Sequence, residues 1–321
     1  MRATLRAGLT VVTASYLLVM LALAAYLRSY SDASPLGMLM AFGPRWLLLV
    51  GWLPLLVAAW FLGRRLLLLI VPGALLTAFA VSGFEVPSLT AAPTRGRALR
   101  LVTYNTDREP AVTARIRGDL ARWNADVVLF QDCAPALLDS LRAIRERTTR
   151  AVSEFCVSTS LPVARLDSLV IPGHRTRALR VVVRTPAGPL AVYSVHVESP
   201  RDALWAARHL DFGRLDESMT HRGGTSAAVR AWVRTDSLPL VVAGDFNLPT
   251  GSAILRRDWG DLTDAFSARG WGFGHSMFAG KFAVRIDHLF VPTTLVVEAV
   301  TQFGGYPSEH QPLLADLAWP R

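Results

Sequence analysis

Lysine is almost absent from this chain of 321 residues. Lys281 is the one lysine, and arginine supplies the other 33 basic side chains, a skew that can follow from genome composition. Acidic residues are scarce in residues 1–97, which contain eight arginines but only Asp32 and Glu85. Most of the net charge of +9 therefore belongs to the N-terminal third, because residues 98–321 hold 26 basic and 23 acidic side chains. A nearly neutral C-terminal part does not predict the large basic face of a nucleic-acid-binding protein.

Cysteine and histidine are also rare. Cys133 and Cys156 are the only cysteines. They could form a disulfide if their part of the chain lies outside the reducing cytoplasm, and two unpaired thiols are the alternative. The seven histidines show no spacing typical of a zinc site, so a zinc enzyme is not expected. His209 and His221 are too far apart to share one helix face, and we interpret both as surface residues.

Apolar residues are plentiful, at 51% of the chain with a mean hydropathy of +0.32, and they concentrate near the N-terminus. Residues 8–27 form a 20-residue run without charge, long enough to cross the ~30 Å hydrocarbon core of a bilayer. A cleaved signal peptide is the alternative, since Arg2 and Arg6 precede the run. The run exceeds the ~7–15 residues of a signal peptide's apolar core, so we favour a membrane span.

Two further apolar runs follow, at residues 46–62 and 66–83. A tight turn at residues 63–65 separates them, and its two arginines can reach lipid headgroups. Pro54 and Pro72 lie inside these runs, where a membrane helix tolerates proline better than a soluble helix does. A re-entrant pair is the alternative. We predict three transmembrane helices.

The predicted orientation places the C-terminal part outside the cytoplasm. Three spans put the two chain ends on opposite sides of the membrane, and the arginine count on the two sides is a tie. The tight turn at residues 63–65 favours the inside, because its two charges lie at the membrane edge. The membrane region is expected to cover residues 1–84. Residues 85–97, which contain two prolines and a glycine between arginines, are predicted to be a linker.

Beyond residue 98 the pattern changes to short β-rich segments separated by helical ones. Alternating or continuous apolar runs predict strands, and longer amphipathic segments predict helices. The predicted strands are residues 99–104, 127–130, 179–183, 190–195, 238–243, 284–291 and 313–317. The predicted helices are residues 111–123, 136–147 and 225–236. Such a mixture over about 220 residues indicates a layered α/β domain.

Polar residues that can bind metals or transfer protons recur at the ends of these strands. In chain order they are Asn105, Asp107, Asp132, His196, Asp245, Asn247, Asp287, Glu309 and His310. Each has an ordinary alternative, because Asp and Asn also favour turns and helix caps, and a histidine can lie in a sheet without a chemical role. Their recurrence in this order is what indicates a site.

Three motifs among these residues resemble the endonuclease/exonuclease/phosphatase superfamily. They are Gly-Asp-Phe-Asn at 244–247, Arg-Ile-Asp-His at 285–288 and Ser-Glu-His-Gln-Pro at 308–312. The resemblance extends from about residue 99 to the end of the chain. It implies a four-layer α-β-β-α sandwich over residues 98–321, in which two mixed sheets lie face to face. It also implies an integral protein of a bacterial inner or plasma membrane, because membrane-attached bacterial members carry two or three N-terminal spans.

The resemblance further implies a metal site for Mg²⁺ or Mn²⁺. Its ligands would be Asp132 and Glu309, with Asn105 and Asp107 nearby. Two positions depart from the usual motifs, since Asp132 stands where glutamate is usual and Glu309 where aspartate is usual. The simplest interpretation is a compensated exchange of side-chain lengths around one ion.

The remaining residues are assigned by the resemblance to in-line attack of water on phosphorus. Asp245 would orient or deprotonate the water. Asn247 and His196 would hold phosphate oxygens. His310, oriented by Asp287, would contact the scissile phosphate and transfer protons.

We therefore expect a membrane-anchored, divalent-metal-dependent phosphoesterase that hydrolyses a phosphodiester or a phosphomonoester. A lipid headgroup is the favoured substrate, since the domain is tethered to the bilayer and nearly neutral. A nuclease is the less favoured alternative, and the arginine-rich residues 165–184 would then line its site or else form a solvated strand face. A third alternative is a catalytically inactive, membrane-tethered binding domain, because two acids are altered.

Overall fold

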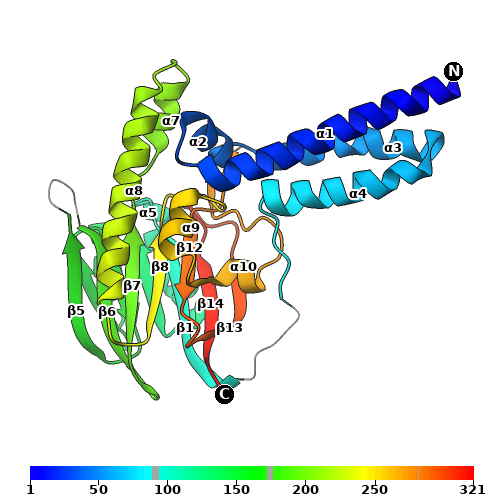
Figure 1. Ribbon diagram of the computed structural model, residues 1–321. Coiled ribbons are helices and arrows are strands. Elements are labelled where there is room, and N and C mark those ends of the chain that lie inside the picture. The colour runs from blue at the N-terminus through cyan, green and yellow to red at the C-terminus, as the bar shows by residue number, and fades with distance from the viewer. Residues whose placement is uncertain (89–93, 172–175, 281) are drawn as a thin grey trace.

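Three apolar helical stretches at the N-terminus form a bundle that projects from the rest of the molecule (Figure 1). The computed structural model describes residues 1–88, 94–171, 176–280 and 282–321. The stretches are Arg2–Tyr30, Arg45–Leu62 and Arg64–Val81, and each is long and apolar enough to cross a membrane. They coincide closely with the three predicted spans.

The bundle is built from α-helices joined by short turns of other helical types. Its elements are α1 (Arg2–Tyr30), η1 (Arg45–Leu49), α3 (Trp52–Leu62), η2 (Arg64–Leu66), α4 (Leu67–Leu76) and η3 (Thr77–Val81). Pro54 lies in the first turn of α3, where the N–H that proline lacks would have no helical partner. Trp52 Nε1 donates a buried hydrogen bond of 2.9 Å to Thr77 Oγ1, which joins α3 to η3.

A short helix that was not predicted, α2 (Pro35–Phe42), follows α1 in the chain and packs against the C-terminal part. Ser34 begins it by accepting a hydrogen bond of 3.1 Å from the Gly37 N–H, and Pro35 occupies the first helical position. Met38 of α2 is fully buried in a cluster with Ala203 and Leu215. The N-terminal bundle is therefore linked to the C-terminal domain through the packing of α2.

The C-terminal domain contains two six-stranded mixed sheets, in the orders β13-β14-β1-β2-β4-β3 and β5-β6-β7-β8-β12-β9. The strands of the first sheet are β1 (Thr94–Asn105), β2 (Val127–Gln131), β3 (Thr148–Val152), β4 (Phe155–Thr159), β13 (Val296–Gln302) and β14 (Leu313–Pro320). Those of the second are β5 (Val163–Val170), β6 (Thr176–Thr185), β7 (Gly188–His196), β8 (Leu240–Asp245), β9 (Thr263–Asp264) and β12 (Asp287–Val291). A separate hairpin consists of β10 (Met277–Ala279) and β11 (Phe282–Val284).

Successive side chains of a strand point to opposite faces of its sheet, so they belong to different layers of the domain. Leu99 and Leu101 of β1 belong to the core between the sheets, whereas Val102 and Tyr104 belong to an outer cluster. Helices cover both outer faces: α5 (Pro110–Trp123) and α6 (Pro135–Arg142) on the first sheet, and α8 (Gly213–Arg234) and α9 (Ala253–Trp259) on the second. Two short helices, α7 (Arg201–Ala207) and α10 (Ala265–Arg269), complete the domain. The predicted four-layer α-β-β-α sandwich is confirmed.

Three predicted elements differ from the structure. The predicted strand 284–291 is divided between β11 and β12, because Ser276 Oγ accepts the N–H groups of Ile286 and Asp287 at 3.0 and 2.9 Å and removes them from the ladder. The predicted helix 136–147 ends at Arg142, since the chain turns there into β3. The predicted helix 225–236 begins at Gly213, twelve residues earlier, despite the two glycines at 223–224.

The segment expected to be a linker is partly structured. Residues 94–97 belong to β1, because the backbone of Thr94 and Arg97 pairs with the last residues of β14. Glu85 exchanges two backbone hydrogen bonds with Gly272, at 2.8 and 3.0 Å. These pairings shorten the connection between bundle and sandwich to a few residues, and part of that connection lies outside the described residues.

Candidate functional site

The predicted polar residues meet at one edge of the two facing sheets. Strands β1 and β2 are parallel, as are β7 and β8, so each pair ends at one edge of its own sheet. A hydrogen bond between Asn105 and Asp245 joins the two edges. His196 and Asp287 both lie opposite Asp245 in register. A cavity of about 270 Å³ opens there, and the side chains that line it are Asn105, Asp107, Asp132, His196, Ser199, Arg201, Asp202, Asp245, Asn247, Met277 and His310.

Asp245 lies at the centre of this cavity and is almost fully buried. Asn105 Nδ2 donates to Asp245 Oδ2 at 2.9 Å, and the backbone N–H of Asn247 donates to Oδ1 at 2.9 Å. Burial raises the pKa of Asp245, and the charge of Asp287 adds to the rise. The carboxylate is thus held firmly, and its proton affinity is increased.

Gly244 allows the strand to approach its neighbour at this point. Its φ is +145°, and a Cβ there would lie 2.0 Å from the carbonyl oxygen of Val195. Asn247, two residues past Asp245, has a φ of 49°, a left-handed conformation that asparagine tolerates. Its Nδ2 donates to Val197 O at 2.9 Å and to Asp245 Oδ2 at 3.1 Å. The Gly-Asp-Phe-Asn motif is therefore a turn that fixes the carboxylate.

His310 is buried beside Asp245 and paired with Asp287. Its Nδ1 lies 2.8 Å from Asp287 Oδ2, and its Nε2 lies 3.7 Å from Asp245 Oδ2. Burial lowers the pKa of His310, but the charges of Asp287 and Asp245 outweigh burial and raise the pKa to about 10. His310 is accordingly protonated at neutral pH and can donate a proton into the cavity.

His196 is held from the other side of Asp245. Its Nδ1 lies 2.9 Å from Glu154 Oε1, and its Nε2 lies 3.6 Å from Asp245 Oδ2. Burial lowers the pKa of His196, but the hydrogen bond to Glu154 and the charges of Asp245 and Asp132 outweigh burial and raise it. Glu154 was not identified from the sequence. It lies in the turn between β3 and β4, where no motif marks it, and only the fold brings it to His196.

The acids predicted to bind metal occupy two adjoining loops. Asp107 and Asp132 both have a φ of 49°, so two carboxylates lie in strained left-handed turns. Asp107 Oδ2 accepts hydrogen bonds from Ser308 Oγ at 2.8 Å and from the Glu309 N–H at 3.1 Å. Arg108 Nε lies 3.4 Å from Asp132. These contacts join the loop after β1 to the loop after β2 and to the segment before β14.

Glu309 occupies a different position from the other acids. Its carboxylate forms an ion pair with Arg201 at the start of α7, and its side chain is 42% exposed. Arg201 lines the cavity and was not identified from the sequence. The role of Glu309 as a metal ligand, and the exchange of lengths with Asp132, stay predictions.

The donors around the cavity suit a hard divalent cation. Ligand atoms of Asp132, Glu154 and His196 lie within 4.8 Å of one another, and so do those of Asp245, Asp287 and His310. The cavity lining adds the oxygens of Asn105 and Asp107. Carboxylate and amide oxygens are the ligands that Mg²⁺ and Mn²⁺ prefer, so the residues present fit such an ion.

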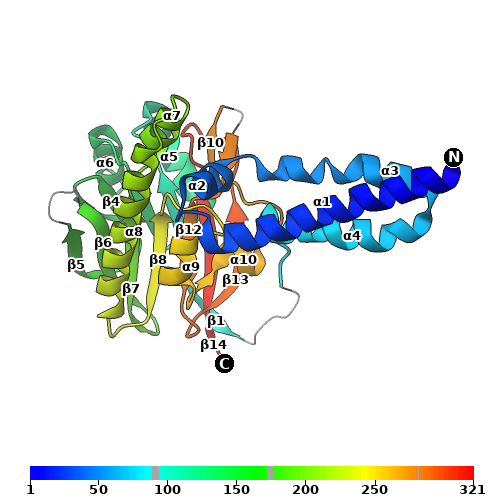
Figure 2. The same cartoon turned by 45° about the horizontal axis from the view of Figure 1, so that its top comes forward.

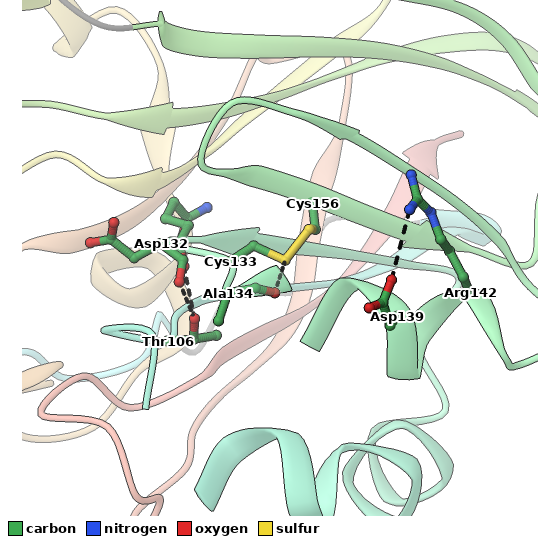
Figure 3. The surroundings of a disulfide bond; sticks show 8 residues. Thr106, Asp132, Cys133, Ala134, Asp139, Arg142 and Cys156 are labelled. Carbon is green, nitrogen blue, oxygen red and sulfur yellow. Dashed lines mark hydrogen bonds and ion pairs between the residues drawn. A yellow bond between two sulfur atoms is a disulfide. The ribbon is translucent and has the colours of Figure 1, made fainter. Parts of the chain in front are cut away.

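A disulfide joins the loop after β2 to strand β4. Cys133 and Cys156 are bonded, with 5.8 Å between their Cα atoms (Figure 3). Cys133 directly follows Asp132, and Cys156 lies two residues after Glu154. The backbone N–H of Cys133 also donates to Glu154 O at 2.9 Å. Of the two alternatives, a disulfide or two free thiols, the structure has the disulfide. This bond anchors the loops that carry Asp132 and Glu154.

Comparison with known proteins identifies the relatives of this domain. Residues 102–310 match the model of the endonuclease/exonuclease/phosphatase family. No curated protein matches the chain significantly. Among solved structures, a humanized D. rerio TDP2 has a TM-score of 0.57 at 15% identity, covering 68% of this chain and 98% of its own. The 3′ phosphatase NExo from Neisseria, bound to product DNA hairpin, has a TM-score of 0.53 at 15% identity, covering 69% and 100%. A Beutenbergia cavernae protein of the same family has a TM-score of 0.51 at 19% identity, covering 70% and 72%.

Proposed function

Since this chain belongs to the endonuclease/exonuclease/phosphatase family, and is thereby a metal-dependent phosphoric ester hydrolase, we propose that it cleaves a phosphoester at a membrane surface. One observation carries the proposal. Asp245 lies between the Asp287–His310 pair and the Glu154–His196 pair in one cavity that also holds Asp132. Such a cavity provides a proton acceptor, proton donors and anionic ligands around a space that can hold a phosphate group.

We infer the roles of the catalytic residues from their positions. Asp245, whose pKa is raised by burial, orients the attacking water and can accept its proton. His310, whose protonated form is stabilised by Asp287, donates to a phosphate oxygen or to the leaving group. His196 holds another phosphate oxygen, which places the phosphorus for in-line attack. Asn247 would have to release Val197 O or Asp245 to hold a phosphate oxygen, because both of its Nδ2 hydrogens are donated there.

The metal would be held on the side of the cavity formed by the acidic loops. Asp132, Asn105 and Asp107 would hold it, with Glu309 joining if its carboxylate leaves Arg201. Bound there, Mg²⁺ or Mn²⁺ would neutralise charge on the phosphate and polarise it toward attack.

Membrane anchoring and orientation complete the proposal. The three apolar stretches support three spans by length and composition, and the disulfide supports a location outside the reducing cytoplasm. We therefore place residues 1–84 in the membrane and the domain at 98–321 outside the cytoplasm. A fusion of alkaline phosphatase after Arg321 should be active on intact cells, whereas an active cytoplasmic reporter at that point would reverse the orientation.

A lipid phosphoester is the substrate class that the domain's surface supports best. Three arginines of β5 and β6, the strands that would line a nucleic-acid site, form ion pairs with acids. Arg165 and Arg180 both contact Asp167, at 2.8 and 3.0 Å, and Arg177 contacts Glu198 at 2.9 Å. Such pairing leaves less charge for a phosphate backbone.

A nuclease is the second candidate, and structures of similar fold favour it. D. rerio TDP2 has been solved with a single-strand DNA product, at 14% identity to this chain and a TM-score of 0.55. Both candidates use the same reacting centre and differ in what surrounds the phosphate.

One experiment tests the proposed function. The full chain is reconstituted in nanodiscs and supplied with Mg²⁺ or Mn²⁺ and a panel of phosphomonoesters, alkyl phosphodiesters, phospholipids and single-stranded DNA. We expect metal-dependent hydrolysis of at least one class, and its loss in His310→Ala prepared in parallel excludes a contaminating hydrolase. No hydrolysis of any ester would favour an inactive binding domain.

A further inference from the structure

A second cavity of about 360 Å³ adjoins the site and has an apolar lining. Ser199, Arg201 and Met277 line both cavities, so the two cavities adjoin at these residues. The other side chains around it are mostly apolar: Leu39, Phe42, Leu204, Trp205, Ala279 and Phe282. The proposed catalytic mechanism uses none of these six residues. We call this second cavity the apolar groove.

Three elements form the walls of the apolar groove, and one of them belongs to the membrane region. Leu39 and Phe42 come from α2, Leu204 and Trp205 from α7, and Phe282 from the β10–β11 hairpin. Figure 2 shows α2 between the domain end of α1 and the helix α7, and β10 lies beside them. Because α1 is the first of the three apolar stretches, the groove lies at the junction of the bundle and the catalytic domain.

The groove leaves large apolar side chains open to solvent. Trp205 of α7 is 59% exposed and Phe282 of β11 is 49% exposed. Exposed apolar surface that lines a concave site marks a place where an apolar ligand or a membrane makes contact. A volume of about 360 Å³ falls within the range of ~300–1,000 Å³ typical of small-molecule pockets.

We propose that the apolar groove binds the hydrocarbon chain of the substrate, which is therefore a lipid phosphoester. This inference rests on the proposed function, because it needs the phosphate to lie in the polar cavity. Arg201 lies where the two cavities meet, and a headgroup phosphate there would be close to a cation while its chain lay along α2 and α7. Since α2 directly follows α1, the groove lies next to the part of the chain from which a membrane lipid would come.

The test measures how hydrolysis depends on chain length. The full chain in nanodiscs is supplied with p-nitrophenyl phosphodiesters that carry a methyl, butyl or octyl group as the second ester. Each methylene transferred from water into an apolar site gains about fourfold in binding, the equivalent of ~0.8 kcal/mol. For a half-open groove we expect kcat/KM to rise at least ~10-fold from the methyl to the octyl ester.

A longer ester could be hydrolysed faster because it binds in the groove or because it partitions into the bilayer. Groove variants distinguish these two causes, because the partition of the ester does not depend on the variant. Trp205→Ser and Phe282→Ser change exposed side chains, so the fold should persist, and together they should reduce the octyl-to-methyl ratio at least ~5-fold. Val170→Ser, at an equally exposed apolar residue of β5, is the matched control and should leave the ratio unchanged. An unchanged ratio in the double variant would overturn the inference. Faster hydrolysis of thymidine 5′-p-nitrophenyl phosphate than of the octyl ester would also overturn it, in favour of a nucleotide substrate.

A second measurement does not depend on turnover. Dodecyl phosphate carrying a diazirine near the end of its chain is cross-linked to the full chain, and the labelled peptides are identified by mass spectrometry. Labels in residues 35–42, 199–208 and 277–284 are expected. Labels confined to the three apolar stretches would overturn the proposal that the groove binds the hydrocarbon chain, even if hydrolysis is observed. Labelling of the groove without any hydrolysis would contradict the proposed function alone.

Discussion

Asp287 and His310 are 23 residues apart in sequence, yet Asp287 Oδ2 lies 2.8 Å from His310 Nδ1. Asp287 begins β12, and the segment with His310 precedes β14 in the other sheet. The pair therefore bridges the two sheets at the edge where the cavity opens. This contact fixes the ring orientation, so that Nε2 is directed toward Asp245 at 3.7 Å.

Removal of the His310 imidazole or of the Asp245 carboxylate should abolish most of the hydrolytic activity. We expect His310→Ala and Asp245→Ala each to lower kcat at least ~10²-fold, the usual contribution of an acid–base group, with the fold retained. Steady-state kinetics with circular dichroism checks this result. His221→Ala, at an exposed histidine, is the control and should retain normal turnover. Normal turnover in both site variants would make the assignments wrong.

Activity should require a divalent cation. Asp107, Asp132 and Asp245 bring three carboxylates to one cavity, and an anionic phosphate cannot approach them closely without a neutralising ion. EDTA should abolish hydrolysis by the full chain, and added Mg²⁺ or Mn²⁺ should restore it. Full activity in excess EDTA would contradict the metal dependence.

The Cys133–Cys156 disulfide should stabilise both the fold and the site. Replacement of both cysteines by serine should lower the free energy of unfolding by about 2–4 kcal/mol, as loss of a native disulfide does. It should also lower kcat, because the loops with Asp132 and Glu154 lose their anchor. Dithiothreitol should lower both the stability and the kcat of the wild type and have no effect on the double variant. If dithiothreitol affected the two proteins equally, its effect would not come from this disulfide.

Asp264 should control stability in acid. Burial raises the pKa of Asp264, but the charge of Arg285 and the hydrogen bond and charge of His288 outweigh burial and hold it well below its usual value. Its ionised form therefore stabilises the folded state above about pH 4, and this contribution is lost as pH falls toward the folded-state pKa. Asp264→Asn should lower stability at pH 7 and flatten the decline in stability below pH 4. Denaturant unfolding between pH 2 and 7 measures both effects, and a decline as steep as that of the wild type would contradict the assignment.

Asp32 should couple the N-terminal apolar bundle to the catalytic domain. Its buried carboxylate accepts the N–H groups of Ala253 and Ile254 at the start of α9, at 2.8 and 3.2 Å, and contacts Ser252 Oγ. Asp32→Ala leaves the Ile254 N–H and the Ser252 hydroxyl without this acceptor, while the Ala253 N–H keeps Ser31 Oγ at 2.9 Å. The loss should cost about 1–3 kcal/mol, measured by thermal unfolding of the full chain. Asp139→Ala, whose side chain is 77% exposed, is the control. Equal melting temperatures for the two variants would show that this contact does not hold the two parts together.

The sequence by itself determined the sandwich and most of the polar edge. Period-two alternation in residues 99–104 separates the two faces of β1 through local geometry, and strand ends in parallel pairs must share an edge. Parallel pairing of β1 with β2 brings Asn105 near Asp132, and that of β7 with β8 brings His196 beside Asp245. The packing of the two sheets then brings the two pairs together. The three apolar stretches also follow from composition alone, because length and hydropathy are local properties.

Only the tertiary structure decided which partners complete the site. Glu154 and Arg201 carry no motif, and their contacts with His196 and Glu309 join segments 42 and 108 residues apart. The apolar groove likewise needs α2 to pack beside α7, which no local pattern encodes. Contacts of this kind arise when separate elements bury their apolar faces against one another, so the energy that selects them belongs to the packed core rather than to any one segment.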